Sequence, residues 1–150
     1  MSGTYSNLLY HIIFCTKNRY PMIHGDFEAE LYRYITGIIQ GEKGQLLAID
    51  GVEDHIHLVV KLKPSHDIPD LLKRTKAHST IWINNNDKVD GRFSWQKGYG
   101  IFSVSASQLS KVIAYVRNQK EHHRNQTSRD ELIGLLLKHD VMFDPHYLDD

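Results

Sequence analysis

The chain has 150 residues, of which 41% are hydrophobic, and this size suits one compact domain with a buried core. We therefore expect a single domain over residues 1–150. No apolar run approaches the roughly 20 residues that a membrane-spanning helix needs, and the first residues lack the charged-then-apolar order of a signal peptide. These features argue against a membrane protein and predict a cytoplasmic one.

Charge is balanced overall but unevenly distributed. The 18 Lys and Arg residues equal the 18 Asp and Glu residues, which taken alone argues against a nucleic-acid partner. Residues 56–129, however, contain 13 basic and 5 acidic side chains, whereas residues 1–55 contain 4 and 7, and residues 130–150 contain 1 and 6. A basic middle between acidic ends fits either a solvated surface or a face that binds phosphates.

The first half of the chain predicts a strand, a helix and a strand pair. Residues 6–16 are rich in aromatic and β-branched types without a helical stripe, as in a buried strand, and the single cysteine, Cys15, is interpreted there as a buried structural thiol. Residues 25–40 place apolar side chains at helical spacing. Residues 46–62 indicate two β segments separated by a turn at residues 51–54, hence a hairpin.

The second half predicts a helix, a strand and two further helices. Residues 69–83 begin with a proline and continue at helical spacing. Residues 100–107 alternate as a strand does and end in serines that can cap a helix over residues 107–124. A last helix is expected at residues 130–139. This order predicts an α+β fold, for which a ferredoxin-like antiparallel sheet covered by helices is the simplest solution.

Two histidines form the first chemical motif. His55 and His57 stand two apart on a predicted strand, so their imidazoles project from one face and can converge on one ion. Two histidines are too few for a closed zinc site but enough to begin an open catalytic site. Because the chain has ten histidines, the pair alone is also compatible with ordinary surface residues.

Tyr115 and Gln119 form the second motif. They are four apart on a predicted helix and hence share a face, away from the buried stripe of that helix. A tyrosine in this position can also be a simple packing residue. Two imidazoles and one amide oxygen would, however, make a three-ligand metal site with open positions beside a phenol nucleophile. His122 could replace Gln119 as a ligand.

These parts complete one mechanism. A phenol with a pKa of about 10 is a poor nucleophile at neutral pH, and a metal helps by polarising the phosphate that it attacks. Attack by Tyr115 would leave a phosphotyrosine on one DNA end and a free hydroxyl on the other. That linkage conserves the phosphodiester energy, so the reverse reaction can rejoin DNA. Mixed imidazole and oxygen ligands suit Mg²⁺ or Mn²⁺.

Basic side chains on the predicted helix at residues 69–83, and on or just beyond the predicted helix at residues 107–124, are candidate phosphate contacts. Helix surfaces carry such charges routinely, so each one is also compatible with a solvated face. Trp95, Tyr99 and Phe102 could stack on bases or belong to the core. The candidate phosphate-binding residues are Lys73, Arg74, Lys76, Lys111, Arg117, Lys120, Arg124 and Arg129.

The sequence resembles the single-tyrosine HUH transposases of small bacterial and archaeal insertion sequences, the IS200-like family. The resemblance is carried by DHIHLVV, which contains His55 and His57, and by YVRNQKEHH, which contains Tyr115 and Gln119. It extends to YHIIFCTKNRY, WQKGYGIFSVS and FDPHYLDD, and so covers about residues 5–148.

This resemblance implies a ferredoxin-like core of the HUH endonuclease type. Tyr115 would be the nucleophile, and His55, His57 and Gln119 would hold Mg²⁺ or Mn²⁺. Such proteins are homodimers in which the tyrosine helix of one subunit completes the metal site of the other. They cut and rejoin single-stranded DNA at hairpins near the element ends through a 5′-phosphotyrosine intermediate.

Three other functions remain open at this point. A domesticated relative would nick hairpin DNA for its host without moving an element. A non-catalytic protein would bind single-stranded nucleic acid through the basic face alone. A metal phosphodiesterase would release its products by attack of water, and Tyr115 would then be structural.

Overall fold

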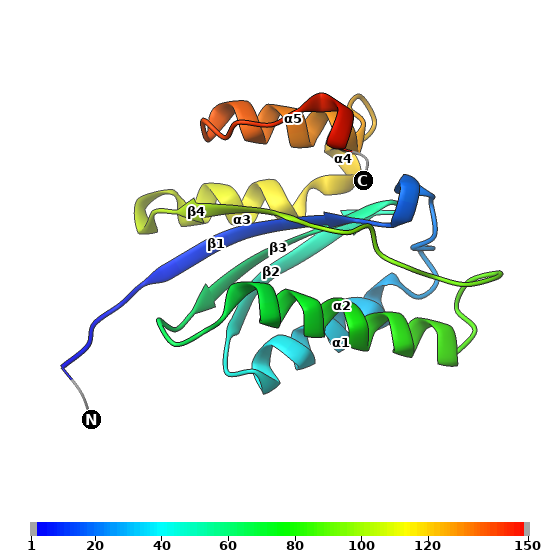
Figure 1. Ribbon diagram of the computed structural model, residues 1–150, viewed down its shortest axis with the longest axis horizontal. Helices are drawn as coiled ribbons and strands as arrows, with labels where there is room; N and C mark the ends of the chain where they lie inside the picture. The colour runs from blue at the N-terminus through cyan, green and yellow to red at the C-terminus, as the bar shows by residue number, and fades with distance from the viewer. Residues whose placement is uncertain (1–2, 149–150) are drawn as a thin grey trace.

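A four-stranded antiparallel sheet forms the centre of the computed structural model, which describes residues 3–148 (Figure 1). The strand order is β2-β3-β1-β4, with β1 paired to both β3 and β4. The strands are β1 (Leu8–Cys15), β2 (Gln45–Val52), β3 (His55–Leu62) and β4 (Gly100–Val104). This order of strands and helices confirms the predicted α+β, ferredoxin-like sheet.

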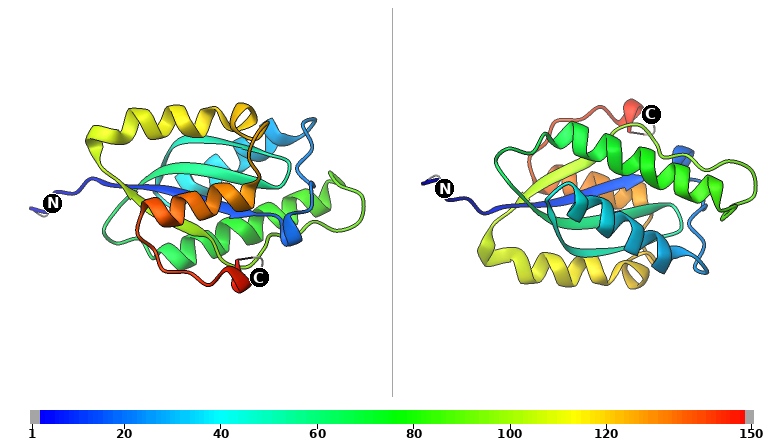
Figure 2. Two further views of the ribbon diagram at one scale, coloured as in Figure 1. Left: turned by 90° about the horizontal axis from the view of Figure 1, so that it is seen from above. Right: turned by 90° about the horizontal axis from the view of Figure 1, so that it is seen from below.

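Helices cover both faces of the sheet (Figures 1 and 2). On one face lie α1 (Glu28–Gly41) and α2 (Ile68–Asn85), and on the other lie α3 (Leu109–Arg117), α4 (Gln119–His122) and α5 (Ser128–Lys138). The central strands β1 and β3 are buried on both sides, which explains why both read as nearly continuous apolar runs. None of the helices in residues 3–148 combines the length and apolar character that crossing a membrane requires.

The hydrophobic core is divided unequally between the two faces. The large cluster lies beneath α1 and α2 and includes Ile56 and Leu58 of β3. On the other face, one small cluster joins Val116 of α3 to the sheet, and another joins Leu136 of α5 to it. Polar residues therefore have room between these two small clusters.

Cys15 and two of the three proposed base-stacking residues belong to the core. Cys15 is buried, and its burial raises the pKa of the thiol to about 11, as expected for a structural cysteine. Trp95 and Phe102 are also buried, whereas Tyr99 is 38% exposed. Trp95 donates a hydrogen bond from its indole nitrogen to the Ser79 hydroxyl, 3.0 Å away. Of the three proposed base-stacking residues, only Tyr99 offers an exposed ring.

Two predicted boundaries are wrong near the tyrosine. The strand predicted at residues 100–107 ends at Val104, and residues 106–108 form a short 3-10 helix. The single helix predicted at residues 107–124 is broken at Asn118, whose φ of −111° and ψ of 30° are not helical. Tyr115 and Gln119 consequently lie on two different helices, α3 and α4.

Gly51 fixes the hairpin that carries the histidines. It pairs with Ile56 across β2 and β3, and a Cβ atom at this position would lie 2.3 Å from the backbone oxygen of His55. We expect Gly51→Ala to lower the free energy of unfolding by about 1 to 3 kcal/mol, because the backbone must shift to admit the methyl group. Urea denaturation followed by circular dichroism measures this change.

The matched control is Gly37→Ala in α1, where a Cβ atom would meet nothing within 4 Å. This substitution should leave the free energy of unfolding unchanged or raise it by up to about 1 kcal/mol, because alanine favours helix. Equal stability of the two variants would contradict the close approach at Gly51.

Candidate active site

Alternation along β3 brings two histidines to the face that carries α3 and α5. Ile56 and Leu58 point into the large cluster, so His55 and His57 point to the opposite side. Both histidines are completely buried. Their ring centroids lie 5.1 Å apart, which confirms that the two imidazoles share one face of the sheet.

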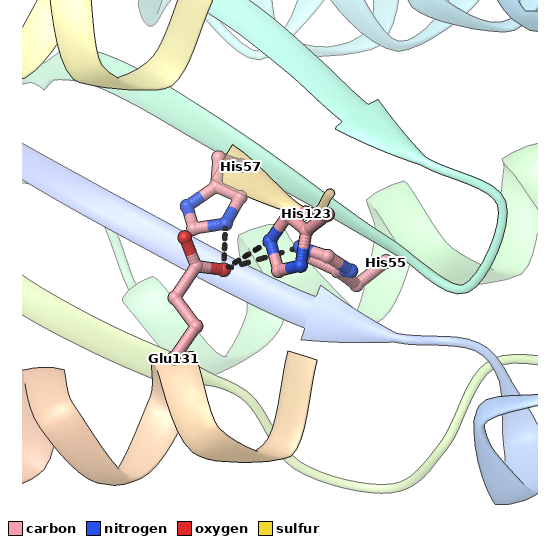
Figure 3. Close-up of side chains that lie close together, drawn as sticks. All are labelled: His55, His57, His123 and Glu131. Atoms are coloured by element: carbon pink, nitrogen blue, oxygen red, sulfur yellow. Dashed lines mark hydrogen bonds and ion pairs between the residues drawn. The ribbon is translucent and has the colours of Figure 1, made fainter. Parts of the chain in front are cut away.

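Two further residues complete a cluster around these histidines. His123 follows α4, and Glu131 lies in the first turn of α5. One carboxylate oxygen of Glu131, Oε1, lies 3.2 Å from His55 Nε2, 2.8 Å from His57 Nε2 and 3.0 Å from His123 Nε2 (Figure 3). The ligand atoms of all four residues lie within 4.8 Å of one another, so three imidazoles and one carboxylate converge on a single point.

Tyr115 contacts this cluster directly. Its hydroxyl donates a hydrogen bond to Oε2 of Glu131, while Oε1 of the same carboxylate faces the histidines. Gln119 is completely buried, and its amide oxygen lies 3.1 Å from His123 Nε2. The structure thus brings together all four residues that the two sequence motifs contributed.

His122 occupies a different place from its neighbour His123. Its ring packs against the Tyr115 ring, with centroids 4.5 Å apart, and it is not a member of the four-residue cluster. His123 is the histidine that faces His55, with ring centroids 4.4 Å apart.

Both buried histidines of β3 are held from behind through Nδ1. Asp54 Oδ1 lies 2.7 Å from His55 Nδ1, and Asp54 Oδ2 accepts a hydrogen bond from the Ser128 hydroxyl at 3.1 Å. His11 Nε2 lies 2.7 Å from His57 Nδ1. With Nδ1 engaged in this way, each ring presents Nε2 to the cluster, as metal-binding histidines usually do.

Burial and charge set the protonation of the site. Burial opposes a charge on His55, but the carboxylates of Asp54 and Glu131 outweigh it and raise its pKa to about 8. Burial lowers the pKa of His57, and it lowers that of His11 to about 3. Burial would raise the pKa of Glu131, but the hydrogen bonds from the surrounding histidines outweigh it and hold the pKa far below its usual value.

The same surroundings change the pKa of the Tyr115 hydroxyl. Burial and the neighbouring carboxylate of Glu131 raise its pKa above the ordinary value, so Tyr115 is a phenol at neutral pH. A cation bound at the cluster would offset the negative charge of Glu131 and so favour loss of the phenolic proton.

The donor set fits a divalent metal ion. Among residues 3–148, no group forms a hydrogen bond with the buried His55 Nε2, although Glu131 Oε1 is close to it. A buried nitrogen in this condition is an available ligand. Imidazole nitrogens together with a carboxylate oxygen, and the Gln119 amide oxygen beside them, are ligands that Mn²⁺ accepts and that Mg²⁺ accepts in part.

Sequence reasoning missed His123 and Glu131. Glu131 carried one usable signal, because it lies one helical turn before Leu135, which packs from α5 against the small cluster with Leu136. A carboxylate on the apolar face of a helix is costly unless it is paired, and Glu131 is only 2% exposed. His123 carried no signal of its own. It follows Gln119 by four residues and His122 follows it by three, and on a helix both spacings bring a side chain to the same face.

The basic residues predicted on α2 lie on the face of the sheet opposite Tyr115 (Figure 1). Arg74 forms ion pairs with Glu42 at 3.1 Å and Asp70 at 3.0 Å. Burial lowers the pKa of Lys76 to about 8, and its ammonium donates hydrogen bonds to the backbone oxygens of residues 96 and 98. Lys73 is exposed on the same helix. These contacts give Arg74 and Lys76 structural partners within the chain.

The other predicted basic residues lie in α3, α4 and α5 or in the loop between α4 and α5, on the face of the sheet that carries Tyr115. Lys120 pairs with Glu28 at 2.9 Å and with Asp50 at 3.3 Å. Arg124 lies 3.5 Å from Glu121, and Arg129 donates a hydrogen bond to the backbone oxygen of residue 145. Lys111 and Arg117 are exposed on α3.

Comparison with known proteins relates this geometry to one family. The family model described as "Transposase IS200 like" matches residues 4–119, a segment that contains His55, His57, Tyr115 and Gln119. His123 and Glu131 follow the matched segment. The ISDra2 transposase TnpA of Deinococcus radiodurans is 25% identical over 124 aligned positions, and the alignment covers 79% of this chain and 89% of that protein.

Two solved structures have a similar fold. A Deinococcus radiodurans R1 protein described as a transposase superposes with a TM-score of 0.63 at 26% identity, covering 79% of this chain and 95% of the other. A REP-associated tyrosine transposase, solved bound to a REP hairpin, superposes with a TM-score of 0.61 at 13% identity, covering 82% of this chain and 74% of the other.

Proposed function

The chain belongs to the family of IS200-like transposases, and from this premise we propose that it cuts and rejoins single-stranded DNA through a 5′-phosphotyrosine intermediate. Membership of the family makes it a DNA-cleaving enzyme. The observation that carries the proposal is the hydrogen bond from the Tyr115 hydroxyl to Glu131, whose other oxygen meets three histidines.

In this proposal Mg²⁺ or Mn²⁺ is held by His55 and His57, together with Gln119. His123 and Glu131 are added to that set because their ligand atoms share the cluster. When bound, the metal would polarise the scissile phosphate and draw negative charge from its oxygens.

Glu131 has a second role in the proposed reaction. Its Oε2 accepts the hydrogen bond from the Tyr115 hydroxyl and so orients the phenolic oxygen, while water takes the phenolic proton. The phenolic oxygen then forms a bond to phosphorus while the bond from phosphorus to the 3′ oxygen breaks. The released 3′ oxygen takes a proton from water, and the 5′ phosphate remains on Tyr115.

The phosphotyrosine retains a phosphodiester linkage, so a 3′-hydroxyl from another strand end can attack it without ATP. Rejoining regenerates the Tyr115 hydroxyl and permits an element to leave one site and enter another. A transposase needs this reversibility, whereas a phosphodiesterase that releases its product to water lacks it.

Hairpins at the element ends are the proposed DNA partners. Support comes from the family resemblance and from the REP-associated neighbour, which is bound to a hairpin. The test uses labelled single-stranded DNA from the sequence flanking the gene, with Mn²⁺, beside a control strand in which the hairpin stem is scrambled. Cleavage of the first strand alone is expected, and no cleavage of either would contradict the proposal.

We also propose a homodimer with active sites completed in trans, as the resemblance implies. Within one chain, Tyr115 already reaches its own Glu131, so arrangements in cis and in trans predict different outcomes when inactive variants are mixed. A His57→Ala subunit retains its tyrosine, and a Tyr115→Phe subunit retains its histidines.

When the two unfolded variants are mixed and refolded together, the mixture should show up to about a quarter of the wild-type cleavage. Random assortment makes about half of the dimers mixed, and each mixed dimer has one complete site in trans. A mixture as inactive as its components, from a protein shown to be dimeric by light scattering, would place the complete site within one chain.

A further inference from the structure

A cavity of about 850 Å³ opens onto the tyrosine between α3 and α5. His11 of β1 and Ser103 of β4 contribute to its lining, as do Tyr115 and Glu131 of the candidate active site. Residues of β1, β4, α3 and α5 line this cavity, and both helices lie over the same face of the sheet when seen from above in Figure 2. Its volume falls within the range of roughly 300 to 1,000 Å³ that is typical of ligand pockets.

The walls of this cavity present two lysines. Lys111 precedes Tyr115 by one turn of α3, and Lys138 follows Glu131 by two turns of α5. Both side chains line the cavity and are exposed. Within the described part of the chain, neither lysine forms an ion pair with a carboxylate, and Glu131 is the single carboxylate in the lining.

A second cavity, of about 720 Å³, also reaches the four-residue cluster, because His123 belongs to its lining. The two cavities share only Gln126. The basic residues of the second cavity are Lys120 and Arg124, and each lies within 3.5 Å of a carboxylate. Its lining also contains four acidic residues, which are Glu28, Glu53, Asp54 and Asp130.

Charge therefore distinguishes the two approaches to the active site. A single DNA strand carries one negative charge per nucleotide, and its backbone is bound by cations and repelled by carboxylates. The cavity with Lys111 and Lys138 suits such a strand, whereas the second cavity has more carboxylates than basic groups.

The remaining lining suits a nucleotide rather than a small anion. Val112 and Leu135 offer apolar surface for a base, and Ser103 offers a hydroxyl for hydrogen bonds. His139, also in the lining, stacks on Phe102 with ring centroids 4.6 Å apart, and so presents an aromatic surface held in place. Proteins that bind single strands combine aromatic or apolar platforms with basic groups in this way.

We propose that this cavity holds the nucleotides next to the scissile phosphate, with Lys111 and Lys138 binding flanking backbone phosphates. The inference rests on the proposed function, which it deepens by naming the path of the strand. Lys111 was among the phosphate contacts expected from the sequence, whereas Lys138 was not.

The test measures binding of a fluorescent oligodeoxythymidine of about ten nucleotides, which forms no hairpin and is long enough for a single-strand site. EDTA is present, so that cleavage cannot interfere. We expect the double variant Lys111→Gln/Lys138→Gln to bind at least about 10-fold more weakly than the wild type at low salt. The slope of log affinity against log salt concentration should also become shallower by about 1 to 2.

Lys17→Gln/Lys63→Gln is the matched control, because it removes the same charge from exposed positions outside the cavity. Its affinity should stay within about 2-fold of the wild type, since it retains both proposed phosphate contacts. Lys120→Gln/Arg124→Gln tests the second cavity. A larger loss in that variant than in Lys111→Gln/Lys138→Gln would assign the strand to the second cavity and overturn the proposal, as would wild-type affinity in Lys111→Gln/Lys138→Gln.

Cleavage separates this inference from the proposed function. If the wild type cleaves hairpin DNA but loss of Lys111 and Lys138 changes neither binding nor cleavage, the proposed strand path alone is wrong. If the wild type binds the oligonucleotide through these lysines but cleaves no DNA under any metal condition, the proposed function is wrong and the binding site stands.

Discussion

Tyr115→Phe is expected to lower the rate of strand cleavage by at least about 10³-fold, because it removes the nucleophile itself. The variant retains every side chain of the metal cluster and loses only the hydroxyl that donates to Glu131. Binding of Mn²⁺ and of single-stranded DNA should therefore stay close to that of the wild type. Cleavage of an end-labelled strand under single-turnover conditions measures the effect.

Tyr34→Phe is the control for this substitution. Tyr34 stacks on Trp82 on the other side of the sheet, with ring centroids 5.3 Å apart, and removal of its hydroxyl should leave cleavage unchanged. Cleavage by Tyr115→Phe at a rate near that of the wild type would show that water, rather than the tyrosine, attacks the phosphate. The protein would then be a metal phosphodiesterase.

His57→Ala is expected to weaken Mn²⁺ binding by at least about 100-fold and to abolish cleavage at ordinary metal concentrations. His57 is completely buried, and its Nε2 lies 2.8 Å from Glu131 Oε1 at the centre of the cluster. Removal of the metal from the wild type by EDTA should have the same effect on cleavage, and added Mn²⁺ should reverse it. Titration followed by the electron paramagnetic resonance of free Mn²⁺ gives the affinity.

His78→Ala provides the comparison, since His78 is exposed on α2, on the opposite face of the sheet. Its Mn²⁺ affinity should equal that of the wild type. If both variants bind Mn²⁺ as the wild type does, or if EDTA leaves cleavage intact, the cluster is not the metal site that the reaction uses.

Local patterns in the sequence were enough to predict the sheet and the first half of the site. Alternation along residues 55–62 placed His55 and His57 on one face because a strand repeats every two residues. The spacing of Tyr115 and Gln119 brought them to one side, although the break at Asn118 separates their helices. A single non-helical residue produces almost no signal in a sequence, so the continuous helix was the natural expectation.

Local patterns could not predict contacts between segments that are far apart in the sequence. Glu131 meets His57 across 74 positions of the chain, and neither periodicity nor charge run joins them. The basic residues show the same difficulty, because a helix pattern does not say which face of a sheet the helix covers. In the sequence, Lys76 and Lys111 both have the pattern of surface lysines. In the structure, Lys76 donates a hydrogen bond to the backbone oxygen of residue 96, whereas Lys111 lines the cavity at Tyr115.

The most direct test of the account is to identify the atom that carries the DNA. The wild-type protein would be incubated with Mn²⁺ and single-stranded DNA from the flanking sequence, digested with nuclease and trypsin, and analysed by mass spectrometry. We expect a nucleotide phosphate on the tryptic peptide of residues 112–117, in which Tyr115 is the sole tyrosine. Cleaved DNA without any modified peptide, or a phosphate on another residue, would contradict it.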